Sequence, residues 1–186
     1  HEIGQYGMYP NYAEIEKYNG VLKARNLEIF RERLEEKGML HLADRFHQAS
    51  GKLAVDAYKA ELEAAVASRE LAGYQILDIQ DFSGQGTALV GILDAFMDSK
   101  GLITPEAWRE FCSAHVLMAS LDRFIFRSGE VVEVPVKFAH YGPSPIESAT
   151  LRLSIFDANS VVYTVEQVLE GAFKGGLFDL ATLKLA

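Results

Sequence analysis

The spacing of apolar residues predicts two helices in the first third of the chain. One is expected from about residue 26 to 38, where a glycine suits a helix end, and a longer one from about 40 to 68. A break or kink in the longer helix is expected at Ser50-Gly51. The apolar positions that set these patterns are Leu27, Phe30 and Leu34 in the first helix, and Leu53, Ala57, Leu62 and Val66 in the second.

The segments around these helices follow other patterns. Residues 1–20 combine glycines with four tyrosines, which is typical of a loop rich in aromatic residues. Residues 74–79 are mostly apolar and predict a short, buried strand of a parallel sheet. A glycine-bearing loop is expected over 83–101. A short helix is expected to follow it, with Thr104 as the N-cap and Pro105 in the first turn.

After about residue 121 the period of the pattern changes from 3.6 to 2. Apolar and polar residues alternate over 132–136 and 151–156, and a turn with a further strand is expected over 157–165. We therefore expect an α/β domain over 1–121 and an all-β domain over 122–186, the second too short for a complete sandwich. The residues expected in its core or at the domain seam are Phe124, Phe126 and Phe138.

The charge composition of the chain limits the classes of partner that we expect. The chain has 186 residues with 26 acidic and 18 basic side chains, a net charge of −8. An acidic chain without a Lys/Arg-rich run is a poor match for nucleic acid or an anionic membrane surface, so neither is expected as a partner. No apolar run approaches the roughly 18 residues of a membrane span. A single cysteine, Cys112, excludes an internal disulfide framework.

The first residues bear on compartment and completeness. The chain starts at His1 without an initiator Met and without a signal peptide, so we expect it to be a piece of a longer polypeptide. The compartment stays open, and a soluble periplasmic or secreted location is compatible with the sequence.

Motifs for metal, phosphate and acyl-transfer chemistry are not complete in this sequence. His1-Glu2 begins like a zinc-binding HExxH helix, but Gln5 stands in place of the second histidine. Gly84-Gln-Gly86 lacks the Lys-Ser/Thr of a phosphate-binding loop, and Gly-x-Ser-x-Gly is absent. We therefore expect neither a metal ion nor another cofactor.

Two carboxylates at the end of the predicted strand form the best candidate site. Asp78 and Asp81 lie beside Gln80 and Gln85, and the C-terminal ends of parallel strands gather ligand-binding groups in α/β folds. Carboxylates and amides near aromatic rings suit a sugar, whose hydroxyls need hydrogen-bond acceptors. Capping of loop amides by the same acids is the alternative, and the residues alone leave both open.

Two segments carry a resemblance to a known family. The chain begins His1-Glu-Ile-Gly-Gln-Tyr, continues with Tyr9-Pro-Asn-Tyr, and later reads Gly73-Tyr-Gln-Ile-Leu-Asp-Ile-Gln-Asp-Phe-Ser-Gly-Gln-Gly86. These segments resemble the end of the catalytic barrel of glycoside hydrolase family 2, the β-galactosidase-like enzymes. The resemblance implies the last two βα units of a (β/α)8 TIM barrel, followed by part of an immunoglobulin-like β-sandwich.

The resemblance also implies a site. Glu2 falls on the nucleophile of a retaining glycosidase, at the tip of the seventh barrel strand, and residues 73–81 fall on the eighth. The acid/base falls upstream of His1, so the chain alone is expected to be inactive, and the rest of its polypeptide is expected to complete the barrel. The side chains expected to bind substrate are His1, Tyr6, Asp78, Asp81 and Phe82.

The function predicted on this basis is hydrolysis of a β-glycoside with retention, with a carbohydrate as substrate. The family's strand-eight tryptophans are replaced here by Ile76-Leu-Asp-Ile79, so Tyr6, Tyr9 or Phe82 is expected to supply the sugar platform. The alternative is a non-catalytic carbohydrate-binding or scaffold and interaction protein, in which Asp78 and Asp81 are kept without the nucleophile.

Overall fold

A computed structural model describes residues 2–82 and 88–185 of the chain. The chain forms two compact units, the first made of residues 1–62 and 72–108 and the second of 63–71 and 109–186. This division falls ahead of the change of period near residue 121, because a strand of the second unit begins before that point. The residues of the sequence expectations that lie outside the described part are His1, Gly84, Gln85 and Gly86.

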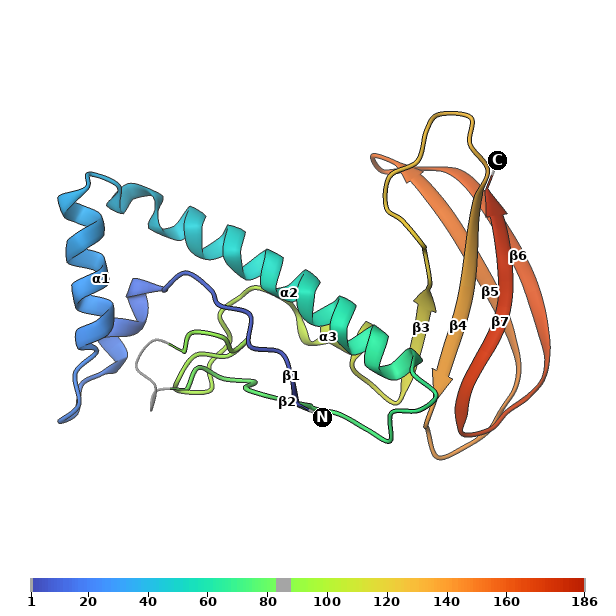
Figure 1. Cartoon of the computed structure of the whole chain (residues 1–186), viewed down its shortest axis with the longest axis horizontal. Coiled ribbons are helices and arrows are strands. Elements are labelled where there is room, and N and C mark those ends of the chain that lie inside the picture. The colour runs from blue at the N-terminus through green and yellow to red at the C-terminus, as the bar shows by residue number, and fades with distance from the viewer. Residues whose placement is uncertain (1, 83–87, 186) are drawn as a thin grey trace. The chain divides into compact units, whose positions relative to one another are not determined.

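The first unit contains short strands, helices and a long irregular segment (Figure 1). In chain order its elements are β1 (Glu2–Ile3), the 3-10 helix η1 (Tyr12–Lys17), α1 (Arg25–Glu36), the 3-10 helix η2 (Leu40–Leu42), α2 (Ala43–Ala67), β2 (Gln75–Ile76) and α3 (Pro105–Phe111). The last turns of α2 and α3 belong to the second unit.

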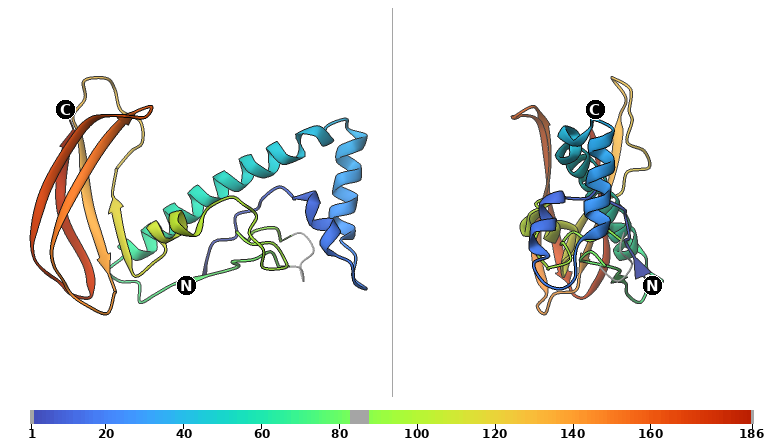
Figure 2. Two further views of the ribbon diagram at one scale, coloured as in Figure 1. Left: turned by 180° about the vertical axis from the view of Figure 1, so that it is seen from behind. Right: turned by 90° about the vertical axis from the view of Figure 1, so that its left-hand side faces the viewer.

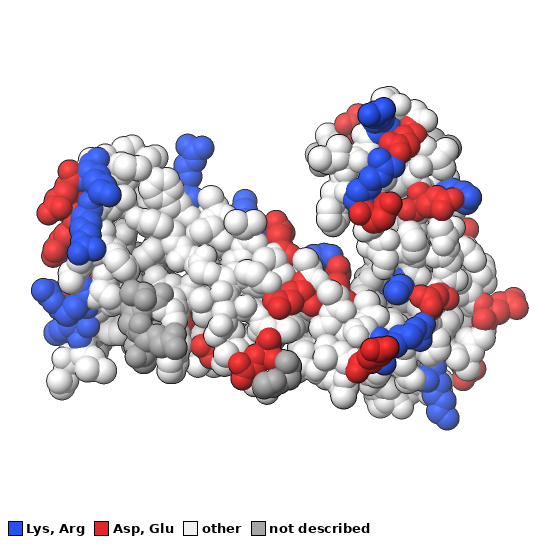
Figure 3. Space-filling model, in the orientation of Figure 1, with Lys and Arg blue, Asp and Glu red and all other residues white. Residues whose placement is uncertain are grey.

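The helices follow the predicted pattern with one exception. α1 buries Leu27 and Leu34, and the backbone turns at Gly38, whose φ of +68° is easily adopted by glycine. Lys, Arg, Asp and Glu side chains cover the outside of this region (Figure 3). The expected break in α2 at Ser50-Gly51 is wrong, because the helix continues through it. An ideal Cβ on Gly51 would lie 2.3 Å from Leu102, so this glycine permits close packing.

Residues 1–20 are less irregular than expected. Residues 4–11 form a loop, but η1 follows it as a short 3-10 helix. The side chain of Asn11 accepts a hydrogen bond from the backbone N–H of Ala13 and so caps this helix. The turn buries Glu14, a polar residue that sequence pattern did not single out.

The predicted strand at 74–79 is shorter and more exposed than expected. β2 pairs with β1 in parallel, with Glu2 opposite Gln75 and Ile3 opposite Ile76. Gln75 is exposed and Ile76 half-buried, because β1 is the one strand that pairs with β2 within the described ranges.

Tyr58 of α2 organises the core of the first unit. Its side chain is 1% exposed and packs with Met8, Ala54 and Ile92. The aromatic rings of Tyr6 and Trp108 meet the Tyr58 ring edge-on, with centroids at 5.2 and 5.8 Å. The Tyr58 hydroxyl donates to the carbonyl of Val90 at 2.8 Å. These contacts join the start of the chain, α2, α3 and the segment after β2.

The second unit contains two antiparallel sheets (Figure 2). Its strands are β3 (His115–Ala119), β4 (Val132–His140), β5 (Ile146–Asp157), β6 (Ser160–Phe173) and β7 (Gly176–Leu185). One sheet has the order β3-β4-β7, and β5 and β6 form a hairpin. The expected turn at 157–160 joins this hairpin, with Ala158 at a φ of 50°.

The alternation of apolar residues explains the core of this unit. Both sheets contribute to one cluster, whose buried members are Val134, Val136, Leu151, Leu169 and Leu183. Phe124 was expected in the core or at a domain seam, yet it is 89% exposed. The residues on either side of Phe124 lack the alternation of apolar and polar residues that buries one face of β4. The coarse prediction, an α/β part followed by an all-β part, agrees with the helices and short parallel strand pair of the first unit and the antiparallel sheets of the second.

No helix within residues 2–82 and 88–185 combines the length and the apolar character needed to cross a bilayer.

Substitution of Gly91 tests how tightly the segment after β2 is packed. An ideal Cβ on Gly91 would lie 2.2 Å from the carbonyl carbon of Gln80 and 2.5 Å from the amide nitrogen of Asp81, so the backbone would have to move. We expect Gly91→Ala to lower the free energy of unfolding of the first unit by about 2 kcal/mol or more. Urea titration followed by Trp108 fluorescence measures this change.

Gly73→Ala is the matched control, because its ideal Cβ has no described atom within 4 Å. Its free energy of unfolding should stay within about 0.5 kcal/mol of the parent value. An unfolding midpoint for Gly91→Ala equal to that of the parent would contradict the packing described for residues 80–91.

Candidate functional site

The parallel pair of strands places Glu2 next to Gln75. The two residues are register partners, and the Gln75 amide lies 3.5 Å from Oε1 of Glu2, at the outer limit of a hydrogen bond. Both side chains are exposed. The carboxylate of Glu2 is therefore accessible from solvent and has an amide donor beside it.

The segment after β1 is fastened to α2 through Glu61. Oε2 of Glu61 accepts hydrogen bonds from the backbone N–H of Gly4 at 3.0 Å and from the hydroxyl of Tyr6 at 2.6 Å. The hydrogen bond to Glu61, followed by burial, raises the pKa of Tyr6 to about 12. Gly4 has a φ of +107°, and an ideal Cβ there would lie 2.7 Å from the Tyr58 ring. A glycine is thus required where the chain passes over Tyr58.

The segment after β2 begins at the same tyrosine. The Tyr58 hydroxyl lies 3.4 Å from the carbonyl oxygen of Asp78, and the Leu77–Asp78 peptide bond is cis. The Asp78 side chain is half-buried. Asp78 and Tyr6 therefore lie on two segments that contact one buried side chain.

Asp81 lies in a different environment from Asp78. Its Oδ1 accepts hydrogen bonds from Lys100 Nζ at 2.7 Å and from the backbone N–H of Gly91 at 3.0 Å. The side chains of Asp81 and Lys100 are 3% and 4% exposed. Burial raises the pKa of Asp81, and the Lys100 ammonium opposes that rise. Asp81 thus caps a loop amide, which is the alternative to sugar binding that the sequence leaves open.

A pocket of about 420 Å³ lies beside this ion pair, and both Asp81 and Phe82 line it. Glu14 of η1 also lines it, with Oε1 accepting from the Tyr18 hydroxyl at 3.3 Å. Burial, then the nearby Asp81 and Asp94, raises the pKa of the Glu14 carboxyl. The Phe82 ring is 46% exposed. The pocket therefore combines buried acids with accessible aromatic surface.

A second group of ion pairs connects η1 with the loop that precedes Lys100. Lys17 of η1 binds the carboxylates of Asp94 and Asp98. The backbone N–H groups of Phe96 and Asp98 donate to Oδ1 of Asp94. These hydrogen bonds, with Lys17 foremost, hold the pKa of Asp94 below its ordinary range against the effect of burial. They tie η1 to the loop before Lys100.

The predicted site residues separate into distinct settings. Glu2 lies in the exposed strand pair, Tyr6 on Glu61, and Asp81 and Phe82 at the pocket. Residues 2–82 and 88–185 contain no group of three or more His, Cys, Asp or Glu that could hold a metal ion.

Sequence pattern missed four residues of this region. Glu61 lies one helical turn after Tyr58 on α2, so a search for polar residues next to the apolar stripe of that helix could have found it. Lys100 comes from a loop far along the chain, and no local signal marks its pairing with Asp81. The missed residues are Glu14, Glu61, Gln75 and Lys100.

A comparison of the chain with protein-family models finds no matching family, and a comparison with curated proteins finds no match. The likeness to a glycosidase barrel therefore rests on the segments 1–12 and 73–86 alone.

The buried carboxyl of Glu14 predicts a defined pH dependence. Because burial raises its pKa, the folded state keeps the proton to higher pH than the unfolded chain does. Stability therefore falls as the pH rises above the ordinary value of 4.5 and Glu14 ionises. We expect Glu14→Gln, which still accepts from Tyr18, to raise the urea midpoint near pH 7. The gain should vanish near pH 4.

Urea titrations of parent and variant between about pH 4 and pH 8 measure this effect. Glu16→Gln is the control, because Glu16 lies on the same 3-10 helix with its side chain exposed. A difference between parent and Glu14→Gln that does not change with pH would contradict the ionisation of a buried Glu14.

Proposed function

We propose that this chain is part of a retaining β-glycosidase in which Glu2 is the catalytic nucleophile. The observation that carries the proposal is the parallel register of β1 and β2, which sets the accessible Glu2 carboxylate beside Gln75. The segment that follows β2 bears Asp78, Asp81 and Phe82. Neighbouring parallel strands whose C-terminal ends carry such groups are typical of sites in α/β enzymes.

The chemistry requires an ionised carboxylate that can reach the substrate. In a retaining glycosidase this group attacks the anomeric carbon, the glycosidic bond breaks, and a covalent glycosyl-enzyme forms. Water then releases the sugar with retained configuration. Glu2 is exposed, and the Gln75 amide is within reach to orient its carboxylate.

A second carboxyl, about 5–5.5 Å from the first, must protonate the leaving oxygen and then activate water. The proposal assigns this acid/base to an earlier barrel strand of a longer polypeptide, as the resemblance implies. The 186-residue chain alone is then inactive.

The same proposal covers the fold in finer detail. β1 and β2 are parallel and connected through α1 and α2, the crossover that a parallel pair requires. We assign residues 1–121 to the last two βα units of a TIM barrel and residues 122–186 to part of an immunoglobulin-like sandwich. The shared core of the two antiparallel sheets supports the second assignment.

Substrate contacts are proposed for the remaining predicted residues. Asp78, half-buried, offers a carboxylate to sugar hydroxyls, and the accessible face of Phe82 offers a surface for the apolar side of the ring. Tyr6 is held neutral and in place by Glu61. Asp81 is bound to Lys100, so its role is to fix the backbone next to Phe82. His1 is kept in the proposal from the resemblance alone.

Kinetics with a panel of aryl β-glycosides test the nucleophile. The protein for this test is the complete product of the reading frame that encodes this chain. We expect Glu2→Gln to lower kcat by about 1,000-fold or more, because the covalent step needs the carboxylate. Glu36→Gln on the exposed end of α1 is the control and should leave kcat unchanged.

Azide separates a nucleophile from a positioning residue. Glu2→Ala with sodium azide should regain cleavage of an activated aryl glycoside: azide attacks the anomeric carbon in place of Glu2, the aryl oxide leaves, and the product is the α-glycosyl azide. Hydrolysis that is indifferent to Glu2 would refute the assignment. Saturable sugar binding without hydrolysis, unchanged in Glu2→Gln, would favour the alternative of a non-catalytic carbohydrate-binding or scaffold protein.

A further inference from the structure

A second pocket in the first unit has no role in the proposed glycosidase. It has a volume of about 340 Å³ and lies between the loop before η1 and helix α1. Of the residues expected to bind substrate, Tyr9, one of the three candidates for the sugar platform, lines this pocket, and the proposed function gives Tyr9 no role. The lining residues are Met8, Tyr9, Pro10, Tyr12, Phe30, Arg33, Leu34, Lys37 and Leu89. Its size is at the lower end of the range for small-molecule sites.

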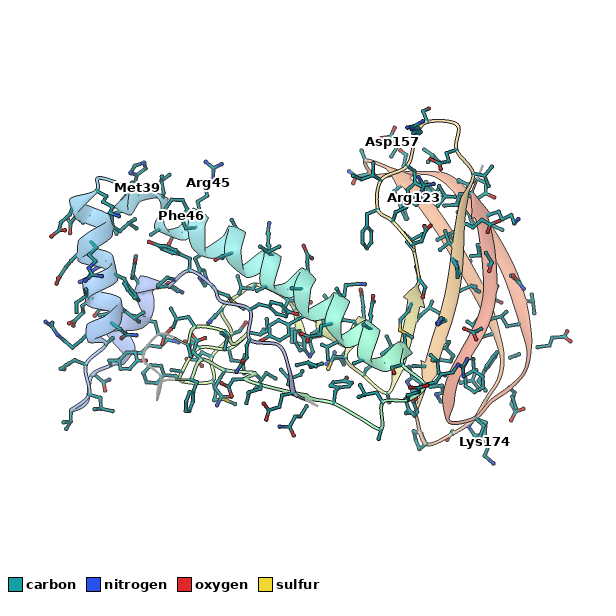
Figure 4. All side chains as sticks on the ribbon, in the orientation of Figure 1. Met39, Arg45, Phe46, Arg123, Asp157 and Lys174 are labelled. Atoms are coloured by element: carbon teal, nitrogen blue, oxygen red, sulfur yellow. The ribbon has the colours of Figure 1, made fainter. Side chains whose placement is uncertain are left out.

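The aromatic wall of this pocket is held rigidly by α2. The backbone N–H of Tyr9 donates to Ser50 Oγ at 2.8 Å, and its carbonyl accepts from Nδ1 of His47 at 2.8 Å. The Tyr9 ring packs edge-on against Phe46, with centroids at 5.3 Å, near the start of α2 in Figure 4. Its hydroxyl lies 3.2 Å from that of Tyr12. A ring-shaped ligand would meet a wall that is already ordered.

The opposite wall is one face of α1 that carries apolar and basic residues together. Phe30, Arg33 and Leu34 of α1 and the C-cap residue Lys37 are spaced at i, i+3, i+4 and i+7, which places them on one side of the helix. The acidic residues of α1 do not line the pocket; they are Glu28, Glu32, Glu35 and Glu36. In a chain of net charge −8, this face therefore presents local positive charge.

The two cations have not been neutralised by the protein. Arg25 at the start of α1 forms an ion pair with Glu28, but neither Arg33 nor Lys37 forms one with any residue in the described part of the chain. Both side chains are exposed at the pocket. Guanidinium and ammonium groups beside an aromatic wall favour a carboxylate or sulfate. A neutral sugar would use the rings but not the charges.

We propose that this pocket binds a small organic anion, namely an apolar or aromatic ring that bears one carboxylate or sulfate group. The ring lies among Met8, Tyr9, Tyr12 and Phe30, and the anion is bound by Arg33 and Lys37. The site is independent of Glu2, so its existence does not depend on the glycosidase assignment.

Three probes of matched structure separate the ring from the charge. The 186-residue chain is titrated with sodium phenylacetate, with neutral phenylacetamide and with sodium acetate, and binding is followed by NMR shifts of the protein amides. We expect saturable phenylacetate binding with a Kd of about 1 mM, in keeping with its small size. Phenylacetamide should bind about tenfold or more weakly, and acetate should not saturate.

Two charge-matched double variants locate the site. Arg33→Gln with Lys37→Gln should weaken phenylacetate binding about tenfold or more. Arg45→Gln with Lys52→Gln removes the same two charges from exposed positions of α2 that do not line the pocket. Figure 4 shows Arg45 directed away from the neighbouring segments. This control should leave the Kd unchanged. All four positions are exposed, so both proteins should keep the parent Trp108 fluorescence and urea midpoint.

Each contrary result overturns the proposal. Equal binding of phenylacetate and phenylacetamide would show an apolar pocket without selection for anions. Equal weakening in both double variants would show a general effect of net charge. Saturable binding of methyl β-D-galactoside in place of phenylacetate would reassign the aromatic wall to a neutral sugar, and no saturable binding of any probe would exclude the site.

Discussion

The first unit depends on the contacts made by one buried side chain, that of Tyr58. One side chain of α2 touches the backbone at Gly4, the rings of Tyr6 and Trp108, and the carbonyl of Val90. Without this residue, the strand pair and the segment after it would lose their common attachment. The buried hydroxyl, which donates to the Val90 carbonyl, also disfavours other arrangements, because losing that hydrogen bond would leave a buried polar group unsatisfied.

The first unit contains both exposed and buried carboxylates. Glu2 lies in a short, exposed strand pair, so its carboxylate has the accessibility that a nucleophile needs. Asp81 and Glu14 are buried, and burial raises the pKa of both. Buried acids next to Lys100 are suited to holding a loop in place, since separating such a pair would leave an uncompensated charge. In the proposed function, the accessible acid Glu2 is the nucleophile and the buried acids hold the loop in place.

The sequence pattern predicted the helices and strands better than it predicted the contacts between residues distant in the chain. Helical period is a local property, so α1, α2 and the Thr104 N-cap of α3 were all predictable, and so were the strands around Val134 and Leu153. The break expected at Ser50-Gly51 was wrong because the glycine is needed for close packing against Leu102, which lies 51 residues further along the chain. The ion pair of Asp81 with Lys100 was beyond prediction for the same reason. The Glu2 and Gln75 pairing could be expected only through the family resemblance.

The most direct test of the account is covalent trapping. The complete gene product is incubated with an activated 2-deoxy-2-fluoro aryl β-glycoside, which forms the glycosyl-enzyme but slows its hydrolysis, and the labelled peptide is identified by mass spectrometry. The account predicts one adduct, on Glu2, that is absent in Glu2→Gln. A stable adduct on any other carboxylate, or full turnover of aryl glycosides with no adduct on Glu2, would contradict it.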